Sequence, residues 1–125
     1  MSGHKITESE YEVMQVLWTA ERPLELGEIM KRLPESKWAR NTVATLLSRL
    51  SGKGIASYEK NGKYNMYYAA VTKEDYGADE TRSLLGRLYD GSIRNLVASL
   101  YSRNALTKED ITSLREMLDP ETNDV

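Results

Sequence analysis

The chain has 125 residues, 40% hydrophobic and 29% charged, with a net charge of -2, and this length suits one domain or a small domain with an appended segment. The absence of cysteine excludes a disulfide framework, a thiolate metal site and a cysteine nucleophile. No apolar run reaches the ~20 residues of a membrane span and the start does not read as a signal peptide, so we expect a cytoplasmic protein without membrane insertion.

The first two elements are expected to be amphipathic helices. Thr7 and Glu10 have the spacing of a capping box, and the helix that follows carries one broad apolar face, with Trp18 expected in the core. The stretch 24–34 predicts a second, shorter helix that stops at Pro34.

The third helix, from about residue 40 to 51, has the clearest pattern. Its apolar residues follow the i, i+3, i+4, i+7 spacing of a buried helix face: Val43, Leu46, Leu47 and Leu50. The remaining positions predict an exposed face of short polar side chains with arginine: Asn41, Thr42, Thr45, Ser48 and Arg49. Trp38, just ahead of this helix, either packs beneath it or rests on a sugar-phosphate backbone.

Residues 55–70 predict a β-hairpin, since Asn61-Gly62 suits a two-residue turn with positive φ. Lys60 and Lys63 flank the expected turn. Four tyrosines in the hairpin allow two interpretations, an alternation between core and surface or a stacking platform for single-stranded nucleic acid. They are Tyr58, Tyr64, Tyr67 and Tyr68.

Three more helices are expected after residue 71. Thr72 with Asp75 and Thr107 with Asp110 mark two starts, while Gly91 and Pro120 mark stops. The apolar stripes exceed what a small winged domain can cover, and such helices commonly pair across a two-fold axis. The expected dimer interface comprises Leu84, Leu85, Leu88, Ile93, Leu96, Val97, Leu100, Tyr101, Ile111, Leu114 and Leu118.

The overall charge conceals a local excess of basic residues. Residues 31–63 hold eight Lys or Arg and only two Glu, which indicates an anion-binding face; the alternative is an ordinary solvated helix surface. Catalysis has little support, because the single histidine, His4, cannot form a metal cluster or a catalytic pair. We therefore expect neither an enzyme nor a cofactor.

Three helices and a two-stranded wing form a winged helix-turn-helix, so the fold class is mainly α. We expect residues 1–71 to bind double-stranded DNA and residues 72–125 to form a helical dimerisation domain. The major groove admits a helix of this kind. The expected base-reading residues are Arg40, Asn41, Thr42 and Thr45. The expected contacts to the DNA backbone are Lys37, Ser48, Arg49, Lys53, Lys60 and Lys63. The alternative is a winged-helix module for protein interaction.

Four segments together resemble the penicillinase-repressor (BlaI/MecI/CopY) family of bacterial regulators: "ITESEYEVMQVLW", "NTVATLLSRLSGKG", "LLGRLYDGSIRNLVASL" and "LTKEDITSLREML". The resemblance implies a homodimeric transcriptional repressor whose winged helix binds inverted repeats of the TACA/TGTA type. It also implies relief of repression by a membrane sensor-protease that leads to cleavage in the dimer helices.

Two departures from the family pattern bear on induction. The Asn-Phe bond cut in β-lactam-linked members aligns with Ser99-Leu100, and the chain has no phenylalanine. The cysteine cluster of copper-responsive members is also absent. The sequence therefore leaves the inducing signal, the regulated genes and the exact operator open.

Overall fold

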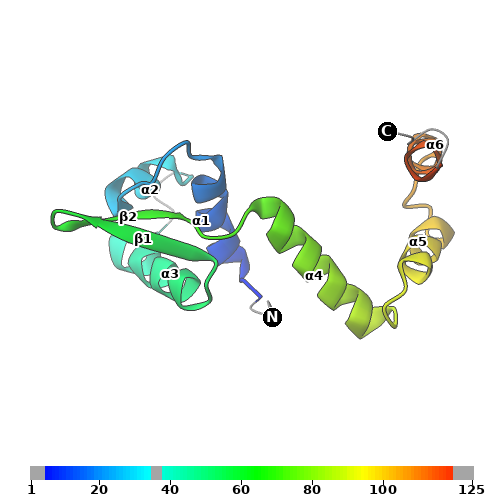
Figure 1. Ribbon diagram of the computed structural model, residues 1–125, viewed down its shortest axis with the longest axis horizontal. Coiled ribbons are helices and arrows are strands. Elements are labelled where there is room, and N and C mark those ends of the chain that lie inside the picture. The colour runs from blue at the N-terminus through cyan, green and yellow to red at the C-terminus, as the bar shows by residue number, and fades with distance from the viewer. Residues whose placement is uncertain (1–4, 35–37, 120–125) are drawn as a thin grey trace. The chain divides into compact units, whose positions relative to one another are not determined.

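The structure is a computed structural model that describes residues 5–34 and 38–119. The order of elements is the one expected from the sequence (Figure 1): α1 (Glu8–Thr19), α2 (Leu26–Arg32), α3 (Arg40–Gly52), β1 (Ala56–Asn61), β2 (Tyr64–Ala69), α4 (Lys73–Leu88), α5 (Ile93–Ser102) and α6 (Lys108–Leu118). The chain divides into two compact units, an N-terminal unit, Met1–Glu80, and a C-terminal unit, Thr81–Val125. This division falls within α4, whereas the boundary expected from the sequence precedes that helix.

The helix starts predicted from Thr and acidic pairs are confirmed. The Thr7 hydroxyl accepts a hydrogen bond from the Glu10 amide at 3.1 Å, and the Glu10 carboxylate accepts one from the Thr7 amide at 2.9 Å. Thr107 and Asp110 form the same reciprocal pair at α6. These bonds satisfy amide groups that a helix cannot pair internally, which fixes where each helix begins.

The core of the N-terminal unit is built by α1, α2, α3 and the hairpin. The side chains with no exposed surface include Val13, Met14, Leu24, Ile29, Val43, Leu47 and Leu50. The strands pair antiparallel, with Ala56 opposite Ala69 and Asn61 opposite Tyr64. Leu24 adds a bridge to the free edge of β2 through two backbone hydrogen bonds with Tyr67, of 2.9 and 2.7 Å.

Both tryptophans pack on this core. Trp18 is half-buried rather than fully enclosed, and its indole donates a hydrogen bond to the Val71 carbonyl at 3.0 Å. Trp38 also packs against the core, which favours the first of its two interpretations. Tyr67 packs there too, while its cross-strand neighbour Tyr58 is exposed.

One charged side chain, Glu10, is buried among the described residues, with 1% of its surface exposed. Lys53, which follows α3, places its ammonium 2.6 Å from the Glu10 carboxylate. Burial alone would raise the pKa of Glu10, but the Lys53 and Thr7 hydrogen bonds and the charges of Lys53 and Arg49 outweigh it and lower that pKa. This ion pair joins α1 to the end of α3, two elements far apart in sequence.

A carboxylate with a depressed pKa stabilises the fold above its unfolded pKa, near 4.5, and loses that contribution as pH falls through the folded pKa. We therefore expect Glu10→Gln to lower the free energy of unfolding at pH 7 by about 1–3 kcal/mol, because it leaves the Lys53 charge without its partner. The mutant should also lose less stability than the wild type on acidification below pH 4.5.

Urea denaturation at several pH values measures both effects. Glu59→Gln, at an exposed wing position, is the control and should keep the wild-type stability and pH dependence. Parallel stability curves for Glu10→Gln and the wild type would contradict the assigned role of the ion pair.

Candidate nucleic-acid interface

Helix α3 presents two chemically distinct faces, as predicted. Its four aliphatic residues are buried, with 5% or less of each side chain exposed. Six of its polar residues are exposed, and Ser51 in the last turn is half-buried. The exposed ones are Arg40, Asn41, Thr42, Thr45, Ser48 and Arg49. No large apolar side chain is exposed along this helix. The exposed face therefore offers hydrogen-bond donors and acceptors with an arginine near each end.

The first turn of α3 differs in charge from the first turns of most other helices in the chain. Ala39, at the cap position, supplies no side-chain hydrogen bond, and the turn contains no carboxylate. By contrast, α1, α2, α4 and α6 all carry acidic residues in their first turns. The partial positive charge at the start of α3 therefore has no acidic side chain in that turn to offset it, and Arg40 adds a full charge there.

The wing turn differs from the prediction by one position. Asn61 pairs with Tyr64 and belongs to β1, so the two turn residues are Gly62 and Lys63 rather than Asn61 and Gly62. Of these two turn residues, only Gly62 has a positive φ, of 66°, as expected for a type II′ turn with glycine at its first central position. Lys63 therefore lies in the tip of the wing, instead of beside it.

The wing tip combines positive charge with an exposed ring. Lys60, Lys63 and Tyr64 are exposed, and the Lys63 ammonium lies 5.9 Å from the centre of the Tyr64 ring. In Figure 1 the tip extends beyond the three helices of the N-terminal unit. The tyrosines do not form one stack, because Tyr67 packs on the core and Tyr64 lies on the other face of the hairpin. The arrangement favours the interpretation of alternation between core and surface.

Lys37 and Lys53 differ from the other residues expected to contact the DNA backbone. Lys37 lies outside the described residues. Lys53 donates to the Glu10 carboxylate and, at 2.9 Å, to the Lys5 carbonyl. Contact between Lys53 and a phosphate would compete with this internal ion pair. Of the expected lysine contacts, Lys60 and Lys63 are therefore the two with exposed side chains and no ion pair in the described structure.

The described part of the chain contains no cluster of three or more His, Asp or Glu side chains able to hold a metal ion. None of its helices has the length and hydropathy required to cross a bilayer.

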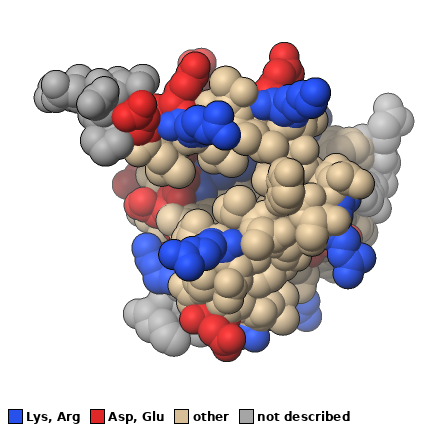
Figure 2. Space-filling view, turned by 90° about the vertical axis from the view of Figure 1, so that its right-hand side faces the viewer, with Lys and Arg blue, Asp and Glu red and all other residues tan. Residues whose placement is uncertain are grey.

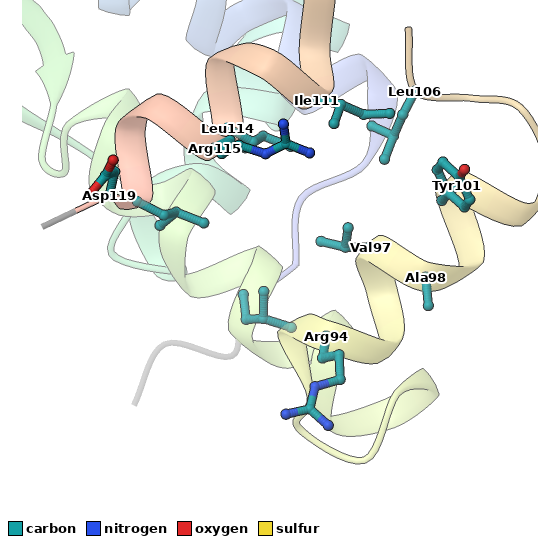
Figure 3. A pocket seen from close by; sticks show the side chains of 11 residues that line it. Arg94, Val97, Ala98, Tyr101, Leu106, Ile111, Leu114, Arg115 and Asp119 are labelled. Carbon is teal, nitrogen blue, oxygen red and sulfur yellow. The ribbon is translucent and has the colours of Figure 1, made fainter. Parts of the chain in front are cut away.

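The C-terminal unit carries a second surface of a different kind, an open apolar groove of about 920 Å³ between α5 and α6. Figure 3 shows Val97 and Tyr101 on α5 facing Ile111 and Leu114 on α6. Figure 2, which looks onto the side where Figure 1 draws these helices, shows a wide uncharged area with charged side chains around its margin. We call this surface the α5–α6 groove.

The eleven residues expected at a dimer interface differ in exposure. Those exposed are Leu88, Ile93, Val97, Leu100, Tyr101 and Leu118; those half-buried are Leu84, Leu96, Ile111 and Leu114. Leu85 is buried within the single chain, so it has little surface left for a partner.

Leu106 also lines the groove and was missed in the sequence. It precedes the Thr107 cap, and with Ile111 it has the spacing of a hydrophobic staple, a signal that would have found it.

The chain is similar to known penicillinase repressors. A family model described as penicillinase repressor matches residues 6–120. The chain is 30% identical over 120 residues to the penicillinase repressor of Bacillus licheniformis, covering 95% of this chain and 93% of that protein. It is 26% identical over 115 residues to the methicillin resistance regulatory protein MecI of Staphylococcus aureus, covering 92% and 94%.

The solved structures that resemble the chain include the monomeric form of Bacillus licheniformis BlaI in complex with the blaP half-operator. The match has a TM-score of 0.50 and 32% identity, and covers 58% of this chain and 89% of that one.

The observed turn predicts opposite effects for two glycine substitutions. Gly62 and Gly52 both have open space where a Cβ would lie, but only Gly62 has a positive φ. Gly62→Ala should lower the free energy of unfolding by about 1 kcal/mol through backbone strain. Gly52→Ala, in the last turn of α3, should leave it unchanged or raise it by about 0.5–1 kcal/mol. Thermal denaturation of the two variants checks the pair, and equal shifts in Tm would contradict the assigned turn.

Proposed function

The chain belongs to the penicillinase repressor family and is a DNA-binding transcriptional repressor rather than an enzyme, and we propose that it acts as a homodimer on an inverted-repeat operator of the TACA/TGTA type. In this proposal residues 1–71 bind DNA and residues 72–125 join the two copies. The observation that carries it is the exposed polar face of α3 above a wholly aliphatic buried face, next to a basic wing.

The exposed face of α3 suits the major groove. That groove is about 12 Å wide and presents a different set of donors and acceptors for each base pair. We assign base reading to Arg40, Asn41, Thr42 and Thr45, in the N-terminal half of α3, since recognition helices contact bases mainly through this half. Arginine suits guanine and asparagine suits adenine, because each can form two hydrogen bonds to the base edge.

The remaining exposed polar residues suit phosphates. We assign Ser48, Arg49, Lys60 and Lys63 to the DNA backbone. Lys37 and Lys53 keep the assignment as weaker candidates, one outside the described residues and the other engaged by Glu10. Such contacts position the protein on the duplex and make binding depend on salt, but they carry no sequence information.

A winged-helix module for protein interaction is the alternative function. Cores of protein interfaces are rich in aromatic and other large apolar side chains. The exposed part of α3 has none, and its first turn is positively charged. These features favour DNA over a protein partner at this face.

The α5–α6 groove supports the homodimer. Neither α5 nor α6 contains a buried residue in the single chain, and Tyr101 and Leu118 are 63% and 75% exposed. An apolar face of this kind is unfavourable in water and commonly marks an interface. A second copy would bring an identical face, and two winged helices related by a two-fold axis fit an inverted repeat.

A membrane sensor-protease is the proposed partner in induction, and family membership alone supports it. Ser99-Leu100, at the position expected for cleavage, lies inside α5 and differs from the family Asn-Phe pair. We therefore assign no cleavage to this bond.

Substitution of Asn41 tests base reading. We expect Asn41→Ala to weaken operator binding by about 1–3 kcal/mol and to relax specificity at one base pair in each half-site. Lys63→Ala should weaken binding to all sequences alike and reduce the slope of log affinity against log salt by about 1. Selection of bound duplexes from a random pool, followed by titrations at several salt concentrations, separates the two. If Asn41→Ala lowered affinity equally for every sequence, the assignment of Asn41 to bases would be wrong.

A charge in the α5–α6 groove tests the homodimer. We expect Val97→Glu to raise the dimer dissociation constant at least 10-fold, because a carboxylate would be buried in an apolar interface. Asn95→Glu places the same charge on α5 away from the groove and should leave association unchanged. Sedimentation equilibrium measures both constants. A monodisperse wild-type monomer at micromolar concentration would refute the homodimer.

A further inference from the structure

The three residues ahead of α1 connect two functionally different elements of the N-terminal unit. Residues Lys5, Ile6 and Thr7 run without regular secondary structure before α1 begins at Glu8. They make hydrogen bonds to a side chain at the end of α3 and to a side chain near the start of α4. We call residues 5–7 the N-terminal strap.

The first connection joins the strap to α3. The Lys53 ammonium donates to the Lys5 carbonyl at 2.9 Å and to the buried Glu10 carboxylate at 2.6 Å. The same carboxylate accepts the Thr7 amide at 2.9 Å. Since Lys53 caps the C-terminal end of α3, these bonds hold the end of the proposed recognition helix against the strap and α1.

The second connection joins the strap to α4. The Ile6 amide donates to the Tyr76 hydroxyl at 3.2 Å. The Tyr76 ring lies 5.9 Å from that of Trp18, which holds the Val71 carbonyl just ahead of α4. Burial raises the pKa of Tyr76, and the nearby Glu80 and Glu10 carboxylates add to that shift, so the hydroxyl stays protonated at neutral pH.

We propose that the N-terminal strap is a positioning element for binding to two half-sites: it fixes the direction in which α4 leaves the N-terminal unit relative to α3, and thereby sets the half-site spacing that the repressor prefers. This inference rests on the proposed homodimer. None of the strap residues needs to touch DNA for this role.

The strap can affect the preferred spacing because the second winged helix binds its half-site after the first is already bound. Once one half-site is occupied, the other winged helix binds with an effective concentration that depends on how tightly its linkage to the first is held. Each added base pair rotates the second half-site by roughly 35° about the DNA axis, so a firm linkage favours one spacing sharply. A loosened linkage lowers the gain at the best spacing and tolerates other spacings.

Tyr76→Phe tests the proposal with little disturbance, because it keeps the ring beside Trp18 and removes only the hydroxyl that accepts the Ile6 amide. The matched control is Tyr11→Phe, in the same aromatic cluster, whose hydroxyl makes no hydrogen bond among the described residues. Affinities are measured by fluorescence anisotropy on a duplex with one half-site and on inverted repeats at the preferred spacing and one or two base pairs either side.

For Tyr76→Phe we expect unchanged affinity for the single half-site and an affinity about 3-fold to 10-fold lower for the best-spaced repeat. Its dependence on spacing should be flatter than that of the wild type, and Tyr11→Phe should match the wild type throughout. Glu10→Gln, which weakens the connection to α3, should lower the same ratio of full-site to half-site affinity.

Three results would overturn the inference. Equal losses on half-site and full site would reduce the strap to a stabiliser of the N-terminal unit. An unchanged ratio and spacing profile would remove its positioning role. An Ile6 amide that exchanges with solvent at the unprotected rate in the wild type would show that the bond to Tyr76 is absent. A wild type that gains nothing from a second half-site would instead refute the homodimer, and that failure is distinguishable because it needs no substitution.

Discussion

The burial of one aliphatic stripe on α3 is the constraint on which the rest of the N-terminal unit depends. Val43, Leu47 and Leu50 have no exposed surface, and α1 and α2 pack on α3. A turn of α3 by one residue, about 100°, would expose leucines at about 1.5–3 kcal/mol each and bury unpaired polar groups at about 1–3 kcal/mol each. The core therefore decides which side chains face outward, and Asn41 and Thr45 are exposed because their neighbours cannot be.

The two units solve the problem of apolar surface differently. The N-terminal unit encloses its aliphatic side chains within three helices and a hairpin. The one charged side chain buried among its described residues, Glu10, has both a cationic partner and a backbone donor. The C-terminal unit leaves α5 and α6 with apolar faces in the open. The polar surface of α3 and the exposed apolar surface of α5 and α6 thus lie on separate parts of the chain, which α4 joins. Each surface is therefore available to a different partner.

Local signals in the sequence predicted much of this structure, and contacts between distant residues account for what they missed. Capping pairs such as Thr7 with Glu10 act over three residues, so the sequence predicts where α1 and α6 begin, and the stripe on α3 predicts its buried face. The wing turn was misplaced by one residue, because Asn61-Gly62 and Gly62-Lys63 are both acceptable turns and strand register decides between them. The Lys53–Glu10 pair spans 43 residues and the Ile6–Tyr76 bond spans 70, distances over which no periodicity operates. The base-reading residues stay predictions, since exposure on α3 is necessary for contact with DNA and does not measure it.

If the proposed homodimer forms, the open α5–α6 groove makes the protein sensitive to its own abundance. Anything that covers this face adds stability in proportion to the logarithm of its concentration relative to the dissociation constant. If the cover is a second copy, a cell with few molecules holds them as lone chains with exposed apolar surface, the form that chaperones and proteases handle first. Scarcity then accelerates removal, and accumulation protects the molecules already made. The apolar surface that each chain leaves exposed would in this way set a minimum abundance, below which the protein is removed faster.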